Sequence, residues 1–377
     1  MSRNILAGIV GLAVGNALGV PVNNWTREEL FKSSVVDMRA STSDTSIPAG
    51  SWSEPTSLTL ASADSLSFGL NYEDMMRRLW QWYKGADYTP FDYVQKVSEP
   101  NQKAIIEVSR GTPALECGLK SAKYADSGSV LRMIPLFYYL TAEFGHDFIE
   151  IEEARGIIHN CSSLTHAQPV CQLGCAIYLA IMAKVSVGMS ISIGVRNELN
   201  HVLKIYSEYP EFSDALKQYG FLFDQNFQFF SPLRFRGTSF VVDTLEKVIW
   251  CFINTNTFEE CVLQTVNMGN NTETAGALAG GLGGVFYGFK NIPQKWKDDL
   301  VQYHELIVPT ADKLFYKLVQ ISMEKIKNYL PYFKKATSER VFREEFDTES
   351  NMKKIKYEFQ SILNGIQPFL FGLEQLQ

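Results

Sequence analysis

Apolar residues recur at helical spacing along most of the first 330 positions of the chain. They return every three or four residues, whereas the strict alternation typical of half-buried strands is scarce. No repeat of about 20–50 residues is present. The pattern predicts an all-α fold, a compact multi-helix bundle with short connectors. The predicted helical segments are 4–18, 55–68, 73–84, 102–108, 128–143, 150–160, 168–187, 193–206, 240–253, 258–267, 273–288 and 298–330.

Three irregular stretches and the end of the chain break this pattern. Residues 32–54, 86–101 and 220–238 lack a clear period, and loops of this length in compact domains usually serve a site. Residues 331–377 keep a helical period but carry more charge. This last stretch is interpreted either as a solvated pair of terminal helices or as a surface for a partner or a second copy.

Two of the predicted helices are rich in glycine and alanine. The segment that begins at Thr274 contains five interior glycines before Gly288, and residues 4–18 have a similar composition. An interior glycine costs a helix about 1 kcal/mol relative to alanine. A chain that keeps several of them needs a close approach between helices, so we predict that these two segments cross at short distance.

Polar residues stand at the ends of the same two segments. Asn16 and Asn23 lie at the end of the first, and Asn271, Glu273 and Thr274 lie at the start of the second. Asn and Thr at such positions are common helix caps. A helix N-terminus also attracts anions, since its N–H groups are unpaired. A ligand site is therefore indicated only where several such stretches converge.

The composition limits the function classes further. The chain has 377 residues, of which 46% are hydrophobic, and a net charge of -6, which argues against a general nucleic-acid binder. None of the six cysteines forms a CxxC pair, which disfavours structural zinc. The apolar N-terminus is interpreted as a buried first helix rather than a leader, and no run is expected to reach the about 18 apolar residues of a membrane span. We expect a cytoplasmic protein with reduced thiols and no membrane partner.

Six segments, taken in order, resemble the ADP-ribosylglycohydrolase family. They are 15-GNALGVPVN-23, 50-GSWSEPT-56, 127-SGSVLRMIPL-136, 163-SLTHAQPVCQLGC-175, 237-GTSFVVDTLEKVIW-250 and 266-VNMGNNTETAGALAGGLGGVFYG-288. The resemblance spans roughly residues 4–312. It implies one family-like domain over residues 1–312, and it leaves residues 313–377 as a helical C-terminal extension packed on or beside that domain.

The resemblance implies a binuclear magnesium centre, and this chain departs from it at the ligands. The positions that match the family's metal ligands hold Ser53, Glu54, Asn271, Glu273 and Thr274. Pro55 stands at a further ligand position and has no ligating side chain. Two carboxylates balance two Mg²⁺ ions poorly, because magnesium prefers several hard oxygen ligands in tight geometry. We therefore expect one ion or none, with two ions disfavoured, and Glu54 and Glu273 as the catalytic candidates.

The segments that match the family's substrate-binding positions are closer to the family pattern than the metal-ligand positions are. Small residues at 127–129 let backbone N–H groups approach a pyrophosphate. Asn16 and Asn23 stand where the family has an aspartate and a catalytic acid; they cannot take a proton, but they can still hydrogen-bond a ribose. The substrate-binding candidates are Asn16, Asn23, Ser127, Gly128, Ser129, His166 and Gly237. An ordinary turn at 127–129, or a capping role for His166, would explain the same residues without a ligand. The expected partner is ADP-ribose or an ADP-ribosylated substrate.

Three functions stay open at this point. The first is a hydrolase that cleaves an ADP-ribosyl or related ribosyl glycosidic bond with a variant, metal-poor site. The second is a catalytically inactive pseudoenzyme that binds ADP-ribose, a nucleotide or a protein partner. The third is an enzyme for a different ribosyl substrate that uses glutamate chemistry without metal. The sequence does not set the oligomeric state.

Overall fold

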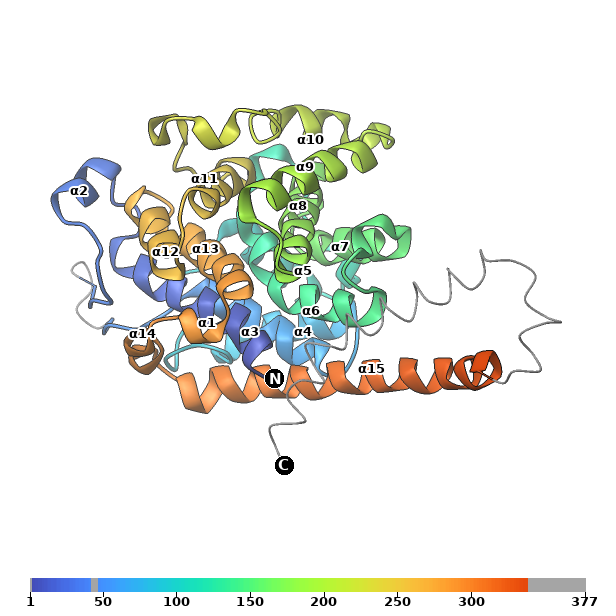
Figure 1. Ribbon diagram of the computed structural model, residues 1–377. Helices are drawn as coiled ribbons and strands as arrows, with labels where there is room; N and C mark the ends of the chain where they lie inside the picture. Colours follow the sequence, from blue (N-terminus) through green and yellow to red (C-terminus); the bar gives the residue numbers. More distant parts are fainter. Residues whose placement is uncertain (1, 42–46, 338–377) are drawn as a thin grey trace.

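The computed structural model describes residues 2–41 and 47–337, and this part of the chain is built from helices (Figure 1). It contains two isolated β-bridges and no β-strand among these residues. The all-α prediction is confirmed. The helices are α1 Ser2–Gly19, α2 Arg27–Lys32, α3 Glu54–Leu66, α4 Tyr72–Gly85, α5 Glu99–Ser109, α6 Met133–Phe144, α7 Glu152–Ser163, α8 Pro169–Ser186, α9 Ile191–Tyr206, α10 Ser213–Gln218, α11 Val241–Ile253, α12 Phe258–Asn267, α13 Thr272–Tyr287, α14 Gln294–Asp299 and α15 Val308–Thr337.

The predicted segments and the observed helices differ in three places. The segment 128–143 is divided into a 3-10 helix, Ser127–Arg132, and α6. The segment 298–330 is divided by a π-turn, Tyr303–Ile307, from which α15 continues. The short helices α2 and α10, and all but the last two residues of α14, were not predicted, because six residues are too few to show a helical period.

The two glycine-rich helices α1 and α13 cross in the core, as predicted. A Cβ atom built on Gly15 would lie 1.9 Å from the carbonyl oxygen of Gly276, and one on Gly280 would lie 2.0 Å from that of Gly11. Real Cβ atoms do not approach backbone this closely, so only glycine fits at these positions. The C-terminal end of α1 is thereby held against the N-terminal end of α13, where the polar residues lie.

Two helices are long and apolar enough to cross a membrane by length and composition alone. They cover Ile5–Val22 and Pro169–Ser186, and the expectation that no run reaches this length was wrong. The share of each window that is buried inside the structure is 94% and 78%, respectively. Their apolar character is accounted for by their place in the core, where side chains on every face are covered.

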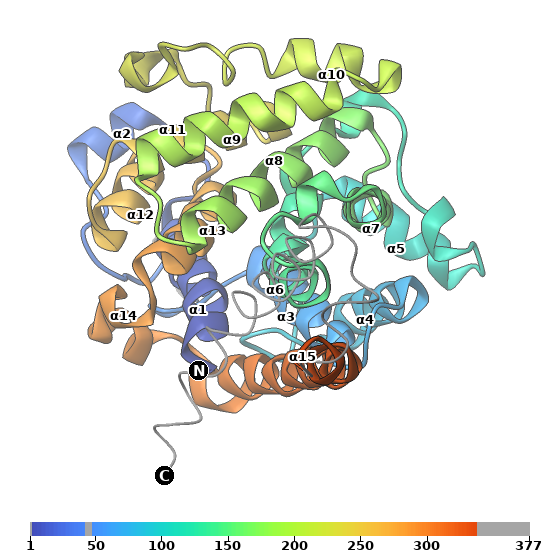
Figure 2. The same cartoon turned by 45° about the vertical axis from the view of Figure 1, so that its right-hand side comes forward.

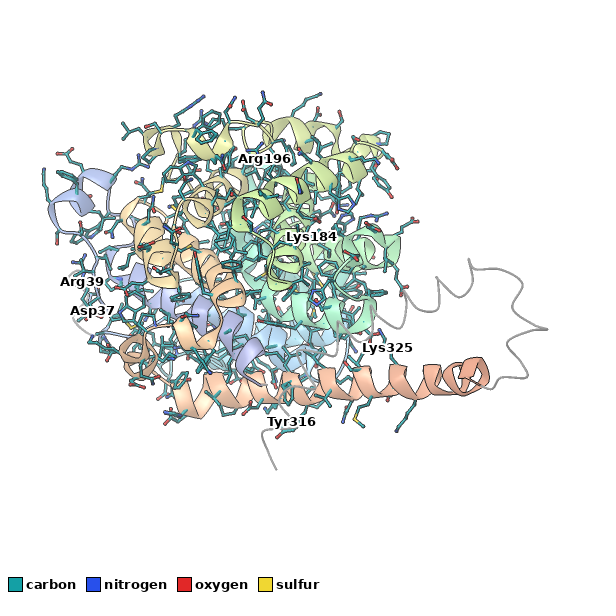
Figure 3. The ribbon with its side chains drawn as sticks, viewed as in Figure 1. Asp37, Arg39, Lys184, Arg196, Tyr316 and Lys325 are labelled. Carbon is teal, nitrogen blue, oxygen red and sulfur yellow. The ribbon has the colours of Figure 1, made fainter. Side chains whose placement is uncertain are left out.

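Helix α15 lies along one side of the molecule, beside α3 and α6 (Figures 1 and 2). Its own Leu314 and Leu318 are buried, and its Lys325 forms an ion pair with Glu143 of α6 at 3.1 Å. Tyr316 points away from the body of the protein (Figure 3). The helix runs without a break through the predicted boundary at residues 312 and 313. Residues 338–377 of the predicted extension lie outside the described residues.

Candidate functional site

A cavity of about 580 Å³ opens where segments far apart in the sequence converge. This volume is within the range of small-molecule sites, about 300–1,000 Å³. Its wall includes every predicted site residue except Asn16, Ser129 and His166. The lining residues are Asn23, Asn24, Ser53, Glu54, Gln95, Lys96, Ser98, Glu99, Pro100, Lys123, Tyr124, Asp126, Ser127, Gly128, Leu131, Gly237, Thr238, Ser239, Asn270, Asn271, Glu273 and Thr274.

Two helices direct their N-termini at this cavity, and each brings a carboxylate in its first turn. Glu54 is the first residue of α3, and Glu273 is the second residue of α13. Negative charge is favoured at a helix N-terminus because the peptide dipoles sum to a partial positive charge there. The helix dipole therefore stabilises the ionised form of both glutamates at these positions, whatever ligand the cavity binds.

Neutral donors hold the Glu273 carboxylate. Asn23 Nδ2 donates to Glu273 Oε1 at 2.7 Å, and the Ser53 hydroxyl donates to Glu273 Oε2 at 3.0 Å. Burial is the main cause of a raised pKa for Glu273, while the bonds from Ser53 and Asn23 and the charge of Lys96 act to lower this pKa. The side chain is thus fixed in position, with one protein donor on each oxygen.

Asn16 lies behind this group and is fully buried. Its Oδ1 accepts hydrogen bonds from the Ser53 backbone N–H at 2.8 Å and from the Thr56 hydroxyl at 2.9 Å. Its Nδ2 donates to the Ser53 hydroxyl at 3.0 Å and to the Glu273 backbone carbonyl at 3.4 Å. Asn16 therefore joins α1, α3 and α13, and it lies outside the cavity wall.

Glu54 is held from the opposite side by the segment that leads into α5. Its carboxylate accepts the Ser98 backbone N–H on both oxygens, at 3.2 and 3.0 Å, the Ser98 hydroxyl at 3.1 Å and Asn101 Nδ2 at 2.9 Å. Burial raises the pKa of Glu54 to about 7, against the lowering effect of these donors, and the charges of Asp126 and Glu273 raise it further. This carboxyl therefore exchanges its proton near neutral pH.

The turn at 127–129 uses two of its amides within the protein. The Gly128 N–H donates to Asp126 Oδ1 at 2.8 Å, and the Ser127 N–H donates to the Ser239 carbonyl at 3.2 Å. Ser127 and Gly128 line the cavity, whereas the Ser129 hydroxyl faces Cys175 in the core. The pyrophosphate-binding role expected for this turn stays a prediction.

His166 is fully buried beneath the cavity wall. Its Nε2 lies 2.8 Å from Asp126 Oδ1, and its Nδ1 lies 2.7 Å from the Thr165 hydroxyl. In this arrangement a hydrogen bond links the imidazole to Asp126, which lines the cavity.

Gly237 and the start of α13 form the remaining wall. A Cβ atom on Gly237 would lie 2.3 Å from Asn270 Nδ2, so this glycine makes room for Asn270. Asn270 has a positive φ of 62° and pairs through its backbone with Trp25 and Asn24. Asn271 Nδ2 donates to the Thr244 hydroxyl at 3.4 Å, and Thr274 lines the cavity.

The donor set does not fit the magnesium centre that the resemblance implies. Both oxygens of Glu273 accept hydrogen bonds from protein donors, and both oxygens of Glu54 accept from Ser98. Pro55 has no side-chain atom that could bind a metal ion. Over residues 2–41 and 47–337, no group of three or more His, Cys, Asp or Glu side chains has a metal-binding arrangement. Magnesium requires several oxygen ligands at about 2.0–2.1 Å in octahedral geometry.

Sequence reasoning named Asn23 and Ser53, which hold Glu273, but it missed the residues that hold Glu54 and the acid beside it. Ser98 and Asn101 lie more than 40 positions from Glu54 in an irregular stretch, and no local pattern marks them. Asp126 had a signal, because Asp followed by Ser-Gly is typical of a side chain that caps its own turn. Lys96, which faces Glu273, had none.

Comparisons with known proteins agree on one family. A family model described as ADP-ribosylglycohydrolase matches residues 2–322. ADP-ribosylarginine hydrolase Tri1 of Serratia proteamaculans (strain 568) is 24% identical over 314 residues, covering 82% of this chain and 78% of that protein. An ADP-ribosyl-(dinitrogen reductase) glycohydrolase of Rhodospirillum rubrum is 24% identical over 298 residues, covering 78% and 89%. A solved structure titled ADP-ribosylglycohydrolase-related protein complex has a TM-score of 0.64 and 21% identity, covers 84% of this chain and 98% of its own, and shows the likeness of fold.

Proposed function

The chain belongs to the ADP-ribosylglycohydrolase family, and we propose that its cavity binds an ADP-ribosyl group and hydrolyses the glycosidic bond that joins it to another molecule. Relatives at 24% identity are named for ADP-ribosylarginine and for ADP-ribosylated dinitrogen reductase. The observation that carries the proposal is Glu54, a carboxyl in the cavity wall whose pKa is raised to about 7. A general base works best with a pKa near the operating pH.

In the proposed reaction, a water molecule attacks the anomeric carbon of the terminal ribose while Glu54 accepts a proton from that water. The bond from this carbon to the leaving nitrogen or oxygen breaks, and the leaving atom takes up the proton that Glu54 removed from the water. The products are ADP-ribose and the released hydroxyl or guanidine group. Glu273 contributes charge: as the ribose carbon becomes oxocarbenium-like, an ionised carboxylate nearby stabilises the positive charge. The side chains of Asn23 and Ser53 hold it in place.

The proposed mechanism has no step through a metal ion. In the family, the resemblance implies magnesium that positions the water. We propose instead that the Glu54 carboxylate in the cavity wall positions the water, and that it exchanges one of its protein hydrogen bonds for one from that water. We propose that ADP-ribose binding does not require a divalent cation.

One observation favours a second function, a binding protein without turnover. Glu54 accepts four hydrogen bonds, and these donors must keep their geometry while it takes up a proton. A carboxylate whose acceptor sites are all occupied by hydrogen-bond donors is a poor base. In that case the cavity would retain ADP-ribose or a nucleotide as a ligand.

Two measurements separate the proposals. The melting temperature is followed with ADP-ribose, with Mg²⁺ and with both, because a ligand that binds only the folded protein raises it. The release of ADP-ribose is then assayed from arginine- and serine-linked substrates. Stabilisation by ADP-ribose together with release that Glu54→Gln abolishes supports the hydrolase. Stabilisation without release supports the binding protein. No stabilisation and no release contradicts both.

A further inference from the structure

Asp126 is a cavity-lining acid to which the proposed reaction gives no role. Its side chain is 19% exposed. Both hydrogen bonds that it accepts from residues of the described chain end on Oδ1, one from the Gly128 N–H and one from His166 Nε2, each at 2.8 Å. A carboxylate has about four acceptor sites on two oxygens. The sites on Oδ2 are therefore available to a molecule in the cavity.

A buried chain of donors orients this carboxylate. Arg132 donates to the Thr165 hydroxyl at 3.0 Å, and this hydroxyl lies 2.7 Å from His166 Nδ1. Because an ionised carboxylate only accepts, His166 Nε2 must carry the proton in its bond to Asp126. In the neutral ring Nδ1 is then an acceptor, and the Thr165 hydroxyl donates to it. His166 is a positioning residue that fixes Oδ1 toward the core.

The backbone fixes the same two residues. Asp126 forms an isolated antiparallel bridge with Phe240, and His166 forms a parallel bridge with Leu119. The Val241 N–H donates to the Ala125 carbonyl at 3.0 Å, next to the first bridge. A group held from its backbone and from one carboxylate oxygen is preorganised, so little side-chain entropy is lost when a ligand binds to it.

Asp126 also lies close to Glu54. A Cβ atom built on Gly128 would lie 2.9 Å from Asp126 Oδ1 and 2.9 Å from Asn101 Nδ2. The same Asn101 nitrogen donates to Glu54 Oε1 at 2.9 Å. Gly128 therefore lies between Asp126 and Asn101, the residue that donates to Glu54, so the carboxyl groups of Asp126 and Glu54 lie in the same part of the cavity. A ribose whose anomeric carbon lies at Glu54 has its neighbouring hydroxyls on that ring within the same part of the cavity.

We propose that Asp126 Oδ2 accepts hydrogen bonds from the vicinal hydroxyl groups of the terminal ribose, and so forms a subsite that recognises a ribosyl diol. The proposal rests on the proposed function of the cavity. Charge-assisted hydrogen bonds of this kind are about twice as strong as neutral ones. The subsite distinguishes an ADP-ribosyl group from ADP, which ends at the second phosphate.

The test compares Asp126→Asn with Glu99→Gln by titration calorimetry, using ADP-ribose, ribose 5-phosphate and ADP as ligands. The asparagine keeps an Oδ1 that accepts from Gly128 and His166, and it replaces the charged Oδ2 by an amide. Glu99 lines the same cavity, pairs with Lys103 at the surface, and loses the same charge in its variant. Loss of negative charge alone should strengthen binding of the anionic ligands.

We expect Asp126→Asn to weaken ADP-ribose and ribose 5-phosphate by about tenfold and to leave ADP unchanged or tighter. Glu99→Gln should weaken none of the three. The proposal is overturned if the ratio of ADP-ribose to ADP affinity is the same in the parent and in Asp126→Asn.

A second measurement on the parent protein does not depend on how the variant folds. ADP-ribose whose terminal ribose lacks the hydroxyl next to the anomeric carbon should bind about tenfold more weakly than ADP-ribose. Equal binding of the two ligands overturns the subsite and leaves the proposed function intact. If ADP-ribose itself does not bind, the proposed function fails, and the subsite fails with it.

Discussion

The two halves of the α1–α13 crossing are held together by different contacts, backbone packing at glycines in one half and side-chain hydrogen bonds in the other. Along Gly11, Gly15, Gly276 and Gly280 the two backbones touch, and an added Cβ would overlap a carbonyl oxygen. At the polar end of the same crossing lie Asn16 of α1, Glu273 of α13 and Asn23, which follows α1 by four residues; hydrogen bonds join them to each other or to Ser53. One half requires the absence of side chains, and the other half requires particular side chains.

This difference separates what the fold needs from what the site needs. The glycine half fixes the distance between the helices, so its residues are constrained by shape alone. In the polar half, the side chains form hydrogen bonds with each other at that distance. These bonds are needed because an unpaired polar group is costly in the low-dielectric interior. A change in the glycine half should therefore reduce stability, whereas changes in the polar half should act on charge, protonation and ligand binding.

The largest expected effect is on the glycine half. Gly280→Val should reduce the free energy of unfolding by about 3 kcal/mol or more, because the backbones must separate to admit the side chain. Urea unfolding measures this. Gly156 in α7 is the matched control, since a Cβ there meets nothing within 4 Å. Gly156→Ala should stabilise the protein by about 0.5–1 kcal/mol. Equal effects in the two variants would contradict the close-packing explanation.

The next effect concerns turnover at Glu54. As a general base this residue must be ionised, so the rate should rise with pH and level off above its pKa of about 7. Glu54→Gln should lower kcat by about 100-fold or more and remove this rise, since a positioned base contributes about 10²–10⁴-fold. The pH profile of ADP-ribose release is the measurement. A profile that is unchanged in Glu54→Gln would assign the base elsewhere.

A smaller effect is expected where Asn23 meets Glu273. Asn23→Asp replaces the donor by an acid, and at about pH 8 two like charges would face each other, which should cost about 1–3 kcal/mol of stability. Near pH 5 one carboxyl retains a proton, the hydrogen bond returns and most of the cost should disappear. Thermal unfolding at both pH values tests this. Asn24→Asp adds the same charge to the same cavity without facing Glu273, and it should show less than half of the pH-dependent loss.

The smallest expected effect is on the pH dependence of stability and concerns Glu246, a carboxyl group outside the cavity wall. Burial raises the pKa of Glu246 in α11 to about 8, from 4.5. The folded protein therefore binds more protons than the unfolded chain between these values, and stability falls as pH rises through this window. Glu246→Gln should leave the free energy of unfolding, measured with urea, unchanged near pH 5 and raise it near pH 8 by an amount on the order of 1–2 kcal/mol. A variant with the same pH slope as the parent would show that Glu246 titrates normally.

Much of the fold was predictable because a helix produces a regular spacing of apolar residues in the local sequence. The segments 168–187 and 258–267 were placed within one residue of α8 and at the bounds of α12, since their apolar spacing is continuous. The close crossing of α1 and α13 followed from glycines that no isolated helix would keep. The predicted domain boundary stays untested, although α15 runs through it.

The candidate site was predictable in part, through motifs that stand together in the chain. Ser53, Glu54 and Glu273 lie in the cavity wall because two helix N-termini bring them there. Their protonation and their partners did not follow from the motifs. The raised pKa of Glu54 depends on burial and on the charges of Asp126 and Glu273, which come from other segments.

The sequence by itself determined the helices, the glycine contact between α1 and α13, and the family to which the chain belongs, because these depend on spacing and residue type along the chain. The tertiary structure decided which donors satisfy each carboxylate. It joined Glu54 to Ser98 and Asn101, Glu273 to Asn23 and Ser53, and Asp126 to His166. Hydrogen bonds between distant segments depend on the relative positions of whole helices, and those positions are set by packing over the entire core.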